Sequence, residues 1–487
     1  MGEGQGTLFS PDFNRSVLIE ARPERLSGDA GALLLRDLTD RLALPALVRK
    51  HLSDPRKSER ITHPFLELLR TQVLLLAQGW RDQQDAALLH DDPVLRLAVS
   101  TRRGEGPLRP SSEEGVPDGL CSQASLSRLL YILAEEGNTA GLAEILRQVV
   151  VPMLNTRRKE ITLDLDSFPH EVHGHQPGTA YNAHYKARCF HPLVASIEGR
   201  YFLGGQLRPG NVHTADGCLD FVLPILRWLR SFTPRVWLRA DAGFPAPAFL
   251  DTLEDEAIPY VCRIRSNRAL ERLAAPFLKR PPGRPPVEGR TWFHELRYRA
   301  KKWKRSRRVV LVLLERPDEQ QHLFLDHFFL LSSASPGEES GEALLDRYRE
   351  RGNAESDFGA FKTTLAPTLS SSPRAKSHYQ GRPIEEPCPG PDTFAANQAK
   401  LLLTLLSANV LAIGADLLSR GEKTRMSRDR FRTLLLKSAA RVLRSGRRII
   451  VVIQSSRAHL WQRFRAQLLQ LPTARGSPHL QALPSQP

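Results

Sequence analysis

Helical and strand-like periodicity divide this chain into two kinds of region. From about residue 30 to 153 the apolar positions recur with the 3.6-residue period of an α-helix, in segments such as Pro64–Gln78 and Ser125–Met153. After residue 160 the pattern changes to the two-residue period of a half-buried strand, carried by Ile161, Leu163 and Leu165. The chain therefore predicts a helical region followed by a region that contains a sheet.

The elements that follow alternate between strands and helices. Two strand-like runs, Lys186–Ile197 and Arg200–Leu207, flank the turn Glu198-Gly199 and predict a hairpin. A helix, a strand, a second helix and a last strand are expected next, at Cys218–Phe232, Val236–Ala240, Pro247–Glu256 and Tyr260–Ile264. This order predicts a mixed α/β layer, and periodicity alone names no particular fold.

Composition divides the chain further. Residues 279–290 are rich in Pro and Arg, residues 297–308 are mostly basic, and strand-like runs follow. The segments we expect are a flexible arm (1–25), a helical DNA-binding and dimerisation region (26–155), the first part of the α/β core (156–265), a basic β-rich insertion (266–335), a helix that completes the core (336–365), a linker (366–392), a C-terminal helical region (393–475) and a disordered tail (476–487).

The charge balance favours a polyanionic partner. Lys and Arg number 69 against 53 Asp and Glu, a net charge of +16. Nucleic acid is the partner that such a surplus suits best, although solubility alone also explains one. The 5 cysteines include no C-x-x-C pair, which indicates a reducing compartment and argues against zinc fingers and disulfide scaffolds.

Membrane and export signals are not expected. The N-terminal residues show no apolar stretch of the secretory kind, so no signal peptide is predicted. The apolar run Leu401–Leu418 is interrupted by Thr404, Ser407, Asn409 and Asp416, and a buried helix is favoured over a membrane span.

Candidate chemistry gathers in the run YRERGNAESDFGAFK. On a helix, the offsets between its polar residues place four side chains within about a 60° arc, namely Tyr348, Arg351, Glu355 and Lys362. Two cations that bind phosphate beside a carboxylate that binds metal suit cleavage of a nucleic-acid backbone. A solvated helix face with an ordinary Arg–Glu pair is the alternative.

Two further carboxylates end strand-like runs upstream. Asp166 follows the first predicted strand, and Asp241 follows Val236–Ala240, where Gly243 lets the chain turn. Ligands collect at the carboxyl ends of strands in α/β layers. Asp164 competes with Asp166, because residues two apart point to the same face of a strand; Asp166 is preferred since it lies nearer the strand's end.

The stripe matches the Tyr-x2-Arg-x3-Glu-x6-Lys signature of DDE transposases related to the insertion-sequence 4 group. Other segments resemble the insertion-sequence 1380 branch and occur in the same order, namely LLLRDLTDRLAL, HDDPVLRLA, LCSQASLSRL, LDLDSFPHEVHGHQPGTAYNAHY to HPLV, RPGNVHTADG, LRADAGF and FAANQAKLLLTLL. The resemblance implies a ribonuclease-H-like catalytic layer with a β-rich insertion, flanked by N-terminal and C-terminal helical regions.

The resemblance also implies an activity. Asp166, Asp241 and Glu355 are expected to be the catalytic residues and to bind two Mg²⁺ ions, with Mn²⁺ as a substitute. The expected enzyme is a bacterial, cytoplasmic, nucleoid-associated DNA transposase. It cleaves and joins the ends of an insertion sequence by a cut-and-paste reaction, and one variant of this reaction passes through hairpin ends. The expected partners are terminal inverted repeats and target DNA, bound by a homodimer. A catalytically silent end-binding regulator and a metal-dependent nuclease are the alternatives.

Several residues are expected to contact DNA. The resemblance places Tyr348, Arg351 and Lys362 near the terminal phosphates. Trp292 or Trp303 is a candidate to stack on a displaced base, with packing inside the insertion as the alternative. Arg128 is expected to be exposed, for a groove or phosphate contact or as part of a structural bundle. The histidine-rich run allows a zinc site, a cleft lining or a plain loop. Its candidate ligands are His170, His173, His175, His184, Cys189 and His191.

Overall fold

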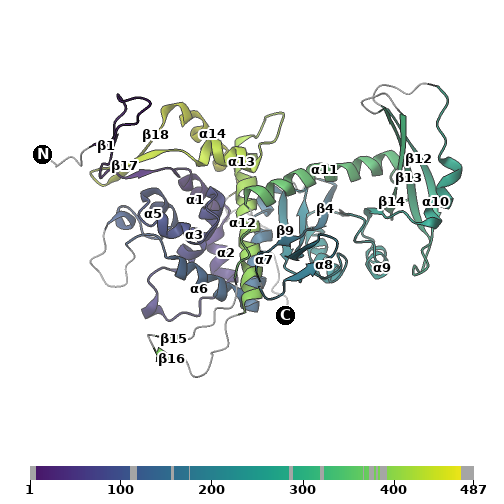
Figure 1. Cartoon of the computed structure of the whole chain (residues 1–487), viewed down its shortest axis with the longest axis horizontal. Helices are drawn as coiled ribbons and strands as arrows, with labels where there is room; N and C mark the ends of the chain where they lie inside the picture. The colour runs from purple at the N-terminus through teal and green to yellow at the C-terminus, as the bar shows by residue number, and fades with distance from the viewer. Residues whose placement is uncertain are drawn as a thin grey trace.

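The computed structural model describes residues 7–472 apart from 110–117, 155–157, 175, 284–288, 318–322, 366, 372–377, 380–381 and 384–391. Some side chains inside otherwise described elements also lie outside it, those of residues 353–358 and 360 among them. The described chain forms a helical lobe and a sheet-containing lobe. The long helix α12 (Thr393–Leu418) lies where they meet, and the long helix α11 (Gly341–Thr364) runs from there along the second lobe (Figure 1).

An eight-stranded mixed sheet organises the second lobe. Its spatial order is β12 (Arg290–Tyr298), β13 (Arg307–Pro317), β14 (Leu323–Ser332), β11 (Tyr260–Ile264), β10 (Arg235–Ala240), β4 (Glu160–Ser167), β8 (Leu193–Ile197) and β9 (Tyr201–Gln206). Strand β10 pairs in parallel with both β4 and β11, whereas β8 is antiparallel to its neighbours β4 and β9.

Five strands of this sheet confirm the ribonuclease-H-like layer, namely β4, β8, β9, β10 and β11. In chain order they occupy the spatial sequence third, second, first, fourth and fifth, and only the second strand runs against the others. The hairpin predicted at Glu198-Gly199 is present, with φ of 53° and 62° at these residues. Two positive φ values are what a tight turn matching the twist of its strands requires.

The β-rich insertion extends the sheet. Strand β14 pairs antiparallel with β11, and β13 and β12 continue outward from it. The insertion therefore prolongs the catalytic layer, where the sequence suggested an interruption. Three helices complete this lobe, namely α8 (Cys218–Leu229), α9 (Pro247–Asp255) and α10 (Arg268–Ala274).

Helix α12 (Thr393–Leu418) is the core of the helical lobe. It contacts α3 (Phe65–Gln78), α6 (Gln123–Ala134) and α7 (Glu136–Gln148), and also β9 of the sheet. Among the described residues it is the one helix long and apolar enough to cross a membrane, and 94% of its most apolar stretch is buried inside the protein. This burial confirms the prediction of a buried helix. A helix whose surface is apolar on all sides is expected to be surrounded by other parts of the protein.

The helical prediction for 393–475 is wrong in part. After α12 and α13 (Arg428–Phe431), strands β17 (Ala440–Ser445) and β18 (Arg448–Ile453) form a hairpin that pairs with β3 (Leu26–Ser27), before α14 (Ala458–Leu469). The β-branched run Ile449–Ile453 and Gly446 at φ 58° explain the difference. Within the expected arm, β1 (Thr7–Phe9) pairs with β2 (Ile19–Glu20).

Candidate active site

Asp166 and Asp241 are neighbours at one edge of the sheet. Asp166 is the second-last residue of β4, and Asp241 directly follows β10. The parallel register pairs Leu165 with Ala240, so the next positions along the two strands are 166 and 241. Adjacent strands lie about 4.8 Å apart, and partners in register point to the same face. The structure thus brings together the two aspartates that the sequence singled out.

Each aspartate has one oxygen engaged by its own turn. The amide of Ser167 donates to Asp166 Oδ1 at 2.8 Å, and the amide of Gly243 donates to Asp241 Oδ1 at 2.7 Å. Asp166 Oδ2 lies 3.3 Å from the guanidinium of Arg351. No hydrogen bond or ion pair from a described residue engages Asp241 Oδ2. The turns fix the carboxylates and leave oxygen atoms for a further partner.

Burial and the second carboxylate both act against ionisation of Asp166. Burial is the largest cause of its raised pKa, and the charge of Asp241 adds to it. Arg351 and Lys362 pull the pKa of Asp166 back down. Each of the two adjacent carboxylates opposes ionisation of the other, and a divalent cation bound to both would favour their charged forms.

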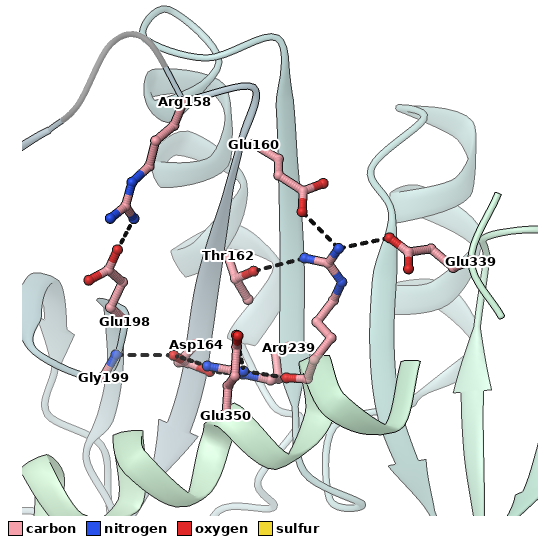
Figure 2. A network of polar contacts seen from close by, with 10 residues as sticks. Arg158, Glu160, Thr162, Asp164, Glu198, Gly199, Arg239, Glu339 and Glu350 are labelled. Atoms are coloured by element: carbon pink, nitrogen blue, oxygen red, sulfur yellow. Dashed lines mark hydrogen bonds and ion pairs between the residues drawn. The ribbon is translucent and has the colours of Figure 1, made fainter. Parts of the chain in front are cut away.

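The carboxylate of Asp164 forms a buried ion pair with Arg239. The guanidinium of Arg239 donates to its two oxygens, Nε to Oδ1 at 2.5 Å and Nη2 to Oδ2 at 3.0 Å, and the amide of Gly199 donates to Oδ2 at 3.2 Å (Figure 2). The Asp164 and Arg239 side chains are 6% and 2% exposed. Asp164 is thus saturated by partners, which supports the choice of Asp166 as the candidate ligand.

Helix α11 (Gly341–Thr364) runs along the face of β4 that carries these residues. Arg347 lies 2.8 Å from Glu160 at the start of the strand, and its carbonyl accepts from Arg239. Arg351, one turn later, reaches Asp166. The helix therefore advances in the direction of the strand's carboxyl end.

Position 355 of α11 lies one further turn toward the acids. It is flanked by Arg351, which contacts Asp166, and by Lys362, whose Nζ lies 5.0 Å from the centroid of the Phe168 ring. The backbone thus places position 355 over the strand end. The side chain of Glu355 lies outside the described residues.

Two of the three predicted DNA contacts on α11, Tyr348 and Arg351, line a cationic cavity of about 420 Å³, and Lys362 is not part of its lining. Its walls include Tyr348, Arg351, Arg263 and Arg265 together with Asp241. Burial raises the pKa of Tyr348, and the nearby Arg351 lowers it. A phenol that stays protonated beside three guanidinium groups suits a phosphate.

Arg263 and Arg265 were missed at the level of sequence. Arg263 is in the last two residues of the predicted strand Tyr260–Ile264 and Arg265 directly follows it, at the same sheet edge as the two aspartates. The rule that ligands collect at strand carboxyl ends could have found them.

The three other predicted DNA contacts lie elsewhere. Trp303 is 5% exposed, with Arg307 4.9 Å above its ring centroid and Tyr298 packed edge-on at 5.4 Å. This packing leaves no accessible ring face for a base, so for Trp303 the structure favours the alternative of packing inside the insertion. Trp292 is half-buried on β12. Arg128 is exposed on α6 in the helical lobe, as expected, and donates to Ser125 Oγ.

The histidine-rich run gives no zinc cluster within the described part of the chain. No three His, Cys, Asp or Glu side chains there are grouped to bind a metal. His184 and His191 instead line a second cavity beside Asp241, and His175 lies outside the described residues. Burial lowers the pKa of His170 to about 4.

The donor set fits a hard divalent cation. Asp166 and Asp241 present carboxylate oxygens on adjoining strands, and Mg²⁺ prefers such ligands over imidazole or thiolate. The fit rests on two described acids, with position 355 on the helix that passes over them.

Comparisons with known proteins match this chain to a family model and to solved structures. The family model described as "Transposase DDE domain group 1" matches residues 9–379. The chain is also similar to the piggyBac transposase solved as a synaptic complex with hairpin DNA, at 14% identity and a TM-score of 0.37, covering 93% of this chain and 86% of that one. A search of curated proteins found no match.

Proposed function

The chain belongs to the DDE transposase family, and from that premise we propose that it cuts the ends of a bacterial transposable element and joins them to new DNA. The observation that carries the proposal is the parallel register that sets Asp166 beside Asp241, with the cationic cavity adjoining them. The insertion-sequence 1380 branch is the subgroup that we propose.

Asp166, Asp241 and Glu355 are the residues that would hold two Mg²⁺ ions, or Mn²⁺ in their place. Such ions, when bound, activate the attacking oxygen and neutralise charge on the phosphate under attack. The turns at Ser167 and Gly243 hold the two aspartates in place before DNA arrives. This preorganisation lowers the cost of assembling the site.

The cations of the site position the DNA backbone. Arg351, Arg263 and Arg265 surround the cavity next to Asp241, and a guanidinium binds phosphate oxygens in a two-pronged fashion. Tyr348 stays protonated and donates a hydrogen bond to the same backbone. Lys362, exposed near the end of α11, adds a point charge farther along the strand.

The proposed reaction consists of two displacements at phosphorus. Water attacks the phosphodiester at the element end, a P–O bond to the 3′ oxygen breaks, and a 3′-hydroxyl is released. That hydroxyl then attacks a phosphodiester of the target, and the target's own 3′ oxygen leaves. In the hairpin variant the hydroxyl first attacks the opposite strand, and water reopens the closed end. A homodimer would align two inverted-repeat ends for these steps.

An in vitro reaction tests the proposal. Purified protein is incubated with labelled duplexes that carry the terminal inverted repeats, a target plasmid and Mg²⁺. Labelled ends joined to the plasmid are the expected product. Cleavage without joining would indicate a nuclease, and binding without cleavage would indicate an end-binding regulator. Either outcome overturns the transposase proposal.

A further inference from the structure

Asp241 lines a second cavity of different character from the cationic one. This cavity has a volume of about 520 Å³, within the range of about 300–1,000 Å³ typical of sites for small ligands. Its walls come from the turn between β6 (Ala180–Asn182) and β7 (Ala187–Phe190), the segment after β9, and the ends of β4, β10 and β11. It therefore opens at the same sheet edge as the candidate catalytic acids.

The two cavities differ in the chemistry of their walls. The first is lined by three arginines, whereas the second has only Arg265 as a fixed cation and is lined mainly by rings and amides, namely Tyr181, His184, Tyr185, His191, Asn211 and His213. Arginines attract phosphate, and flat rings with polar edges are what a nucleobase meets in its binding sites.

Tyr185 is the ring best held in this second cavity. Its centroid lies 4.8 Å from that of His184 and 5.8 Å from that of His191, both in edge-to-face geometry. Such pairs fix a ring in place. Tyr185 is half-buried and lines the same cavity as Asp241, so it lies beside the reacting phosphate's expected position.

We propose that this cavity binds an unpaired nucleobase adjacent to the phosphodiester under attack, with Tyr185 as the surface on which the base stacks. The inference rests on the proposed function and adds a subsite to it. A base inside a duplex is stacked on both faces and cannot enter a pocket, so the base must leave its pair. Tyr185 thereby takes the place of the buried Trp303 as the stacking candidate.

The test uses terminal-repeat duplexes with 2-aminopurine at single positions on either side of the cleavage point. Without Mg²⁺, wild-type protein should change the fluorescence at one position next to the cut. Tyr185→Ala should lose that change and cleave roughly 10-fold more slowly or worse, the scale of lost base–aromatic stacking. Tyr185→Phe should keep both properties, because the phenyl ring is retained.

Two controls separate this subsite from a general defect. Trp461→Ala should leave the fluorescence change in place, since Trp461 lies on α14 and lines neither cavity. An abasic nucleotide at the responsive position should remove the difference in rate between wild type and Tyr185→Ala. If wild type cleaves the ends but Tyr185→Ala keeps the fluorescence change, the subsite is refuted and the transposase proposal stands. If wild type does not cleave, the proposed function itself fails.

Discussion

Arg239 and Asp164 form a buried ion pair two residues before Asp241 and Asp166 on the same two strands. The same guanidinium donates to the carbonyl of Arg347 on α11 (Figure 2). The pair therefore joins β4, β10 and the helix that carries position 355. On each strand the ion pair lies two residues before the candidate acid. This position indicates that the pair fixes the placement of α11 relative to the two acids.

Asp164→Asn and Asp166→Asn should have opposite effects. Asp164→Asn leaves the Arg239 charge buried without its partner, which costs about 3–5 kcal/mol of stability. Asp166→Asn removes a carboxylate whose ionisation is opposed by burial, so stability should stay the same or rise while cleavage is lost. Denaturant midpoints and cleavage rates measured on both variants check this.

A matched control comes from a second buried ion pair, which joins strand β13 to helix α9. Arg307 is 2% exposed on the side chain and lies 2.5 Å from Asp251. Asp251→Asn should lower stability and leave the cleavage rate of the remaining folded protein intact. Loss of cleavage by Asp166→Asn only through unfolding, or a stable Asp164→Asn protein, would show that the two roles are assigned the wrong way round.

Asp241→Asn should abolish cleavage and leave binding to the element ends largely unchanged. The substitution keeps the shape of the side chain and its bond to the Gly243 amide while removing the charge. Gel-shift and cleavage assays on the same labelled ends provide the measurement. Persistent cutting by this variant would take Asp241 out of the site.

Lys362→Ala should weaken end binding in a salt-dependent way. Each phosphate contact that is lost reduces the slope of log K against log salt concentration by about 0.9. Titrations at several salt concentrations measure that slope for wild type and variant. Arg463→Ala is the control, because Arg463 is already paired with Glu422 at 2.6 Å. An equal slope change in both variants would mean that Lys362 makes no specific phosphate contact.

Lys400 should make the free energy of unfolding increase as the pH rises from about 8 to 10.5. Its side chain is 2% exposed, its Nζ has no hydrogen-bond partner in the described structure, and burial lowers its pKa from 10.5 to about 8. Below pH 8 both folded and unfolded chains carry the proton, so the cost of burying the charge, on the order of 3 kcal/mol, is fully present. Between pH 8 and 10.5 only the unfolded chain keeps the proton, and stability should rise with pH.

The variant Lys400→Met isolates this contribution. It should raise the unfolding midpoint at pH 7, and the gain over wild type should shrink as the pH approaches 10.5. Thermal or denaturant unfolding of both proteins across this range gives the comparison. A constant difference at all pH values would show that Lys400 is not buried as a charged group.

Local pattern predicted the catalytic layer well because each of its strands ends in a recognisable way. The alternation up to Leu165 and the glycine after Asp241 both marked strand ends that the structure confirms. Periodicity could not separate Asp164 from Asp166, since both point to one face. The partner that separates them, Arg239, lies 75 residues away along the chain.

Long-range pairing explains what the sequence did not predict. Whether the insertion interrupts or extends the sheet depends on the pairing of Val261 with Ser332, which no local pattern encodes. Trp303 in a basic segment suggested exposure, yet Arg307 and Tyr298 enclose its ring. In the hairpin β17–β18 the signal was present as Gly446 followed by the β-branched run Ile449–Ile453, but the many arginines around it masked the pattern.

Metal-specificity exchange tests the central claim, that Asp166 and Asp241 are ligands of one metal site, most directly. A cysteine thiolate is a softer ligand than a carboxylate, so Asp166→Cys and Asp241→Cys should be inactive with Mg²⁺ and regain end cleavage with Mn²⁺. Asp164→Cys should show no such exchange, because Asp164 binds Arg239. Failure of both Asp166→Cys and Asp241→Cys to recover with Mn²⁺, or full activity of either in Mg²⁺, would contradict the account.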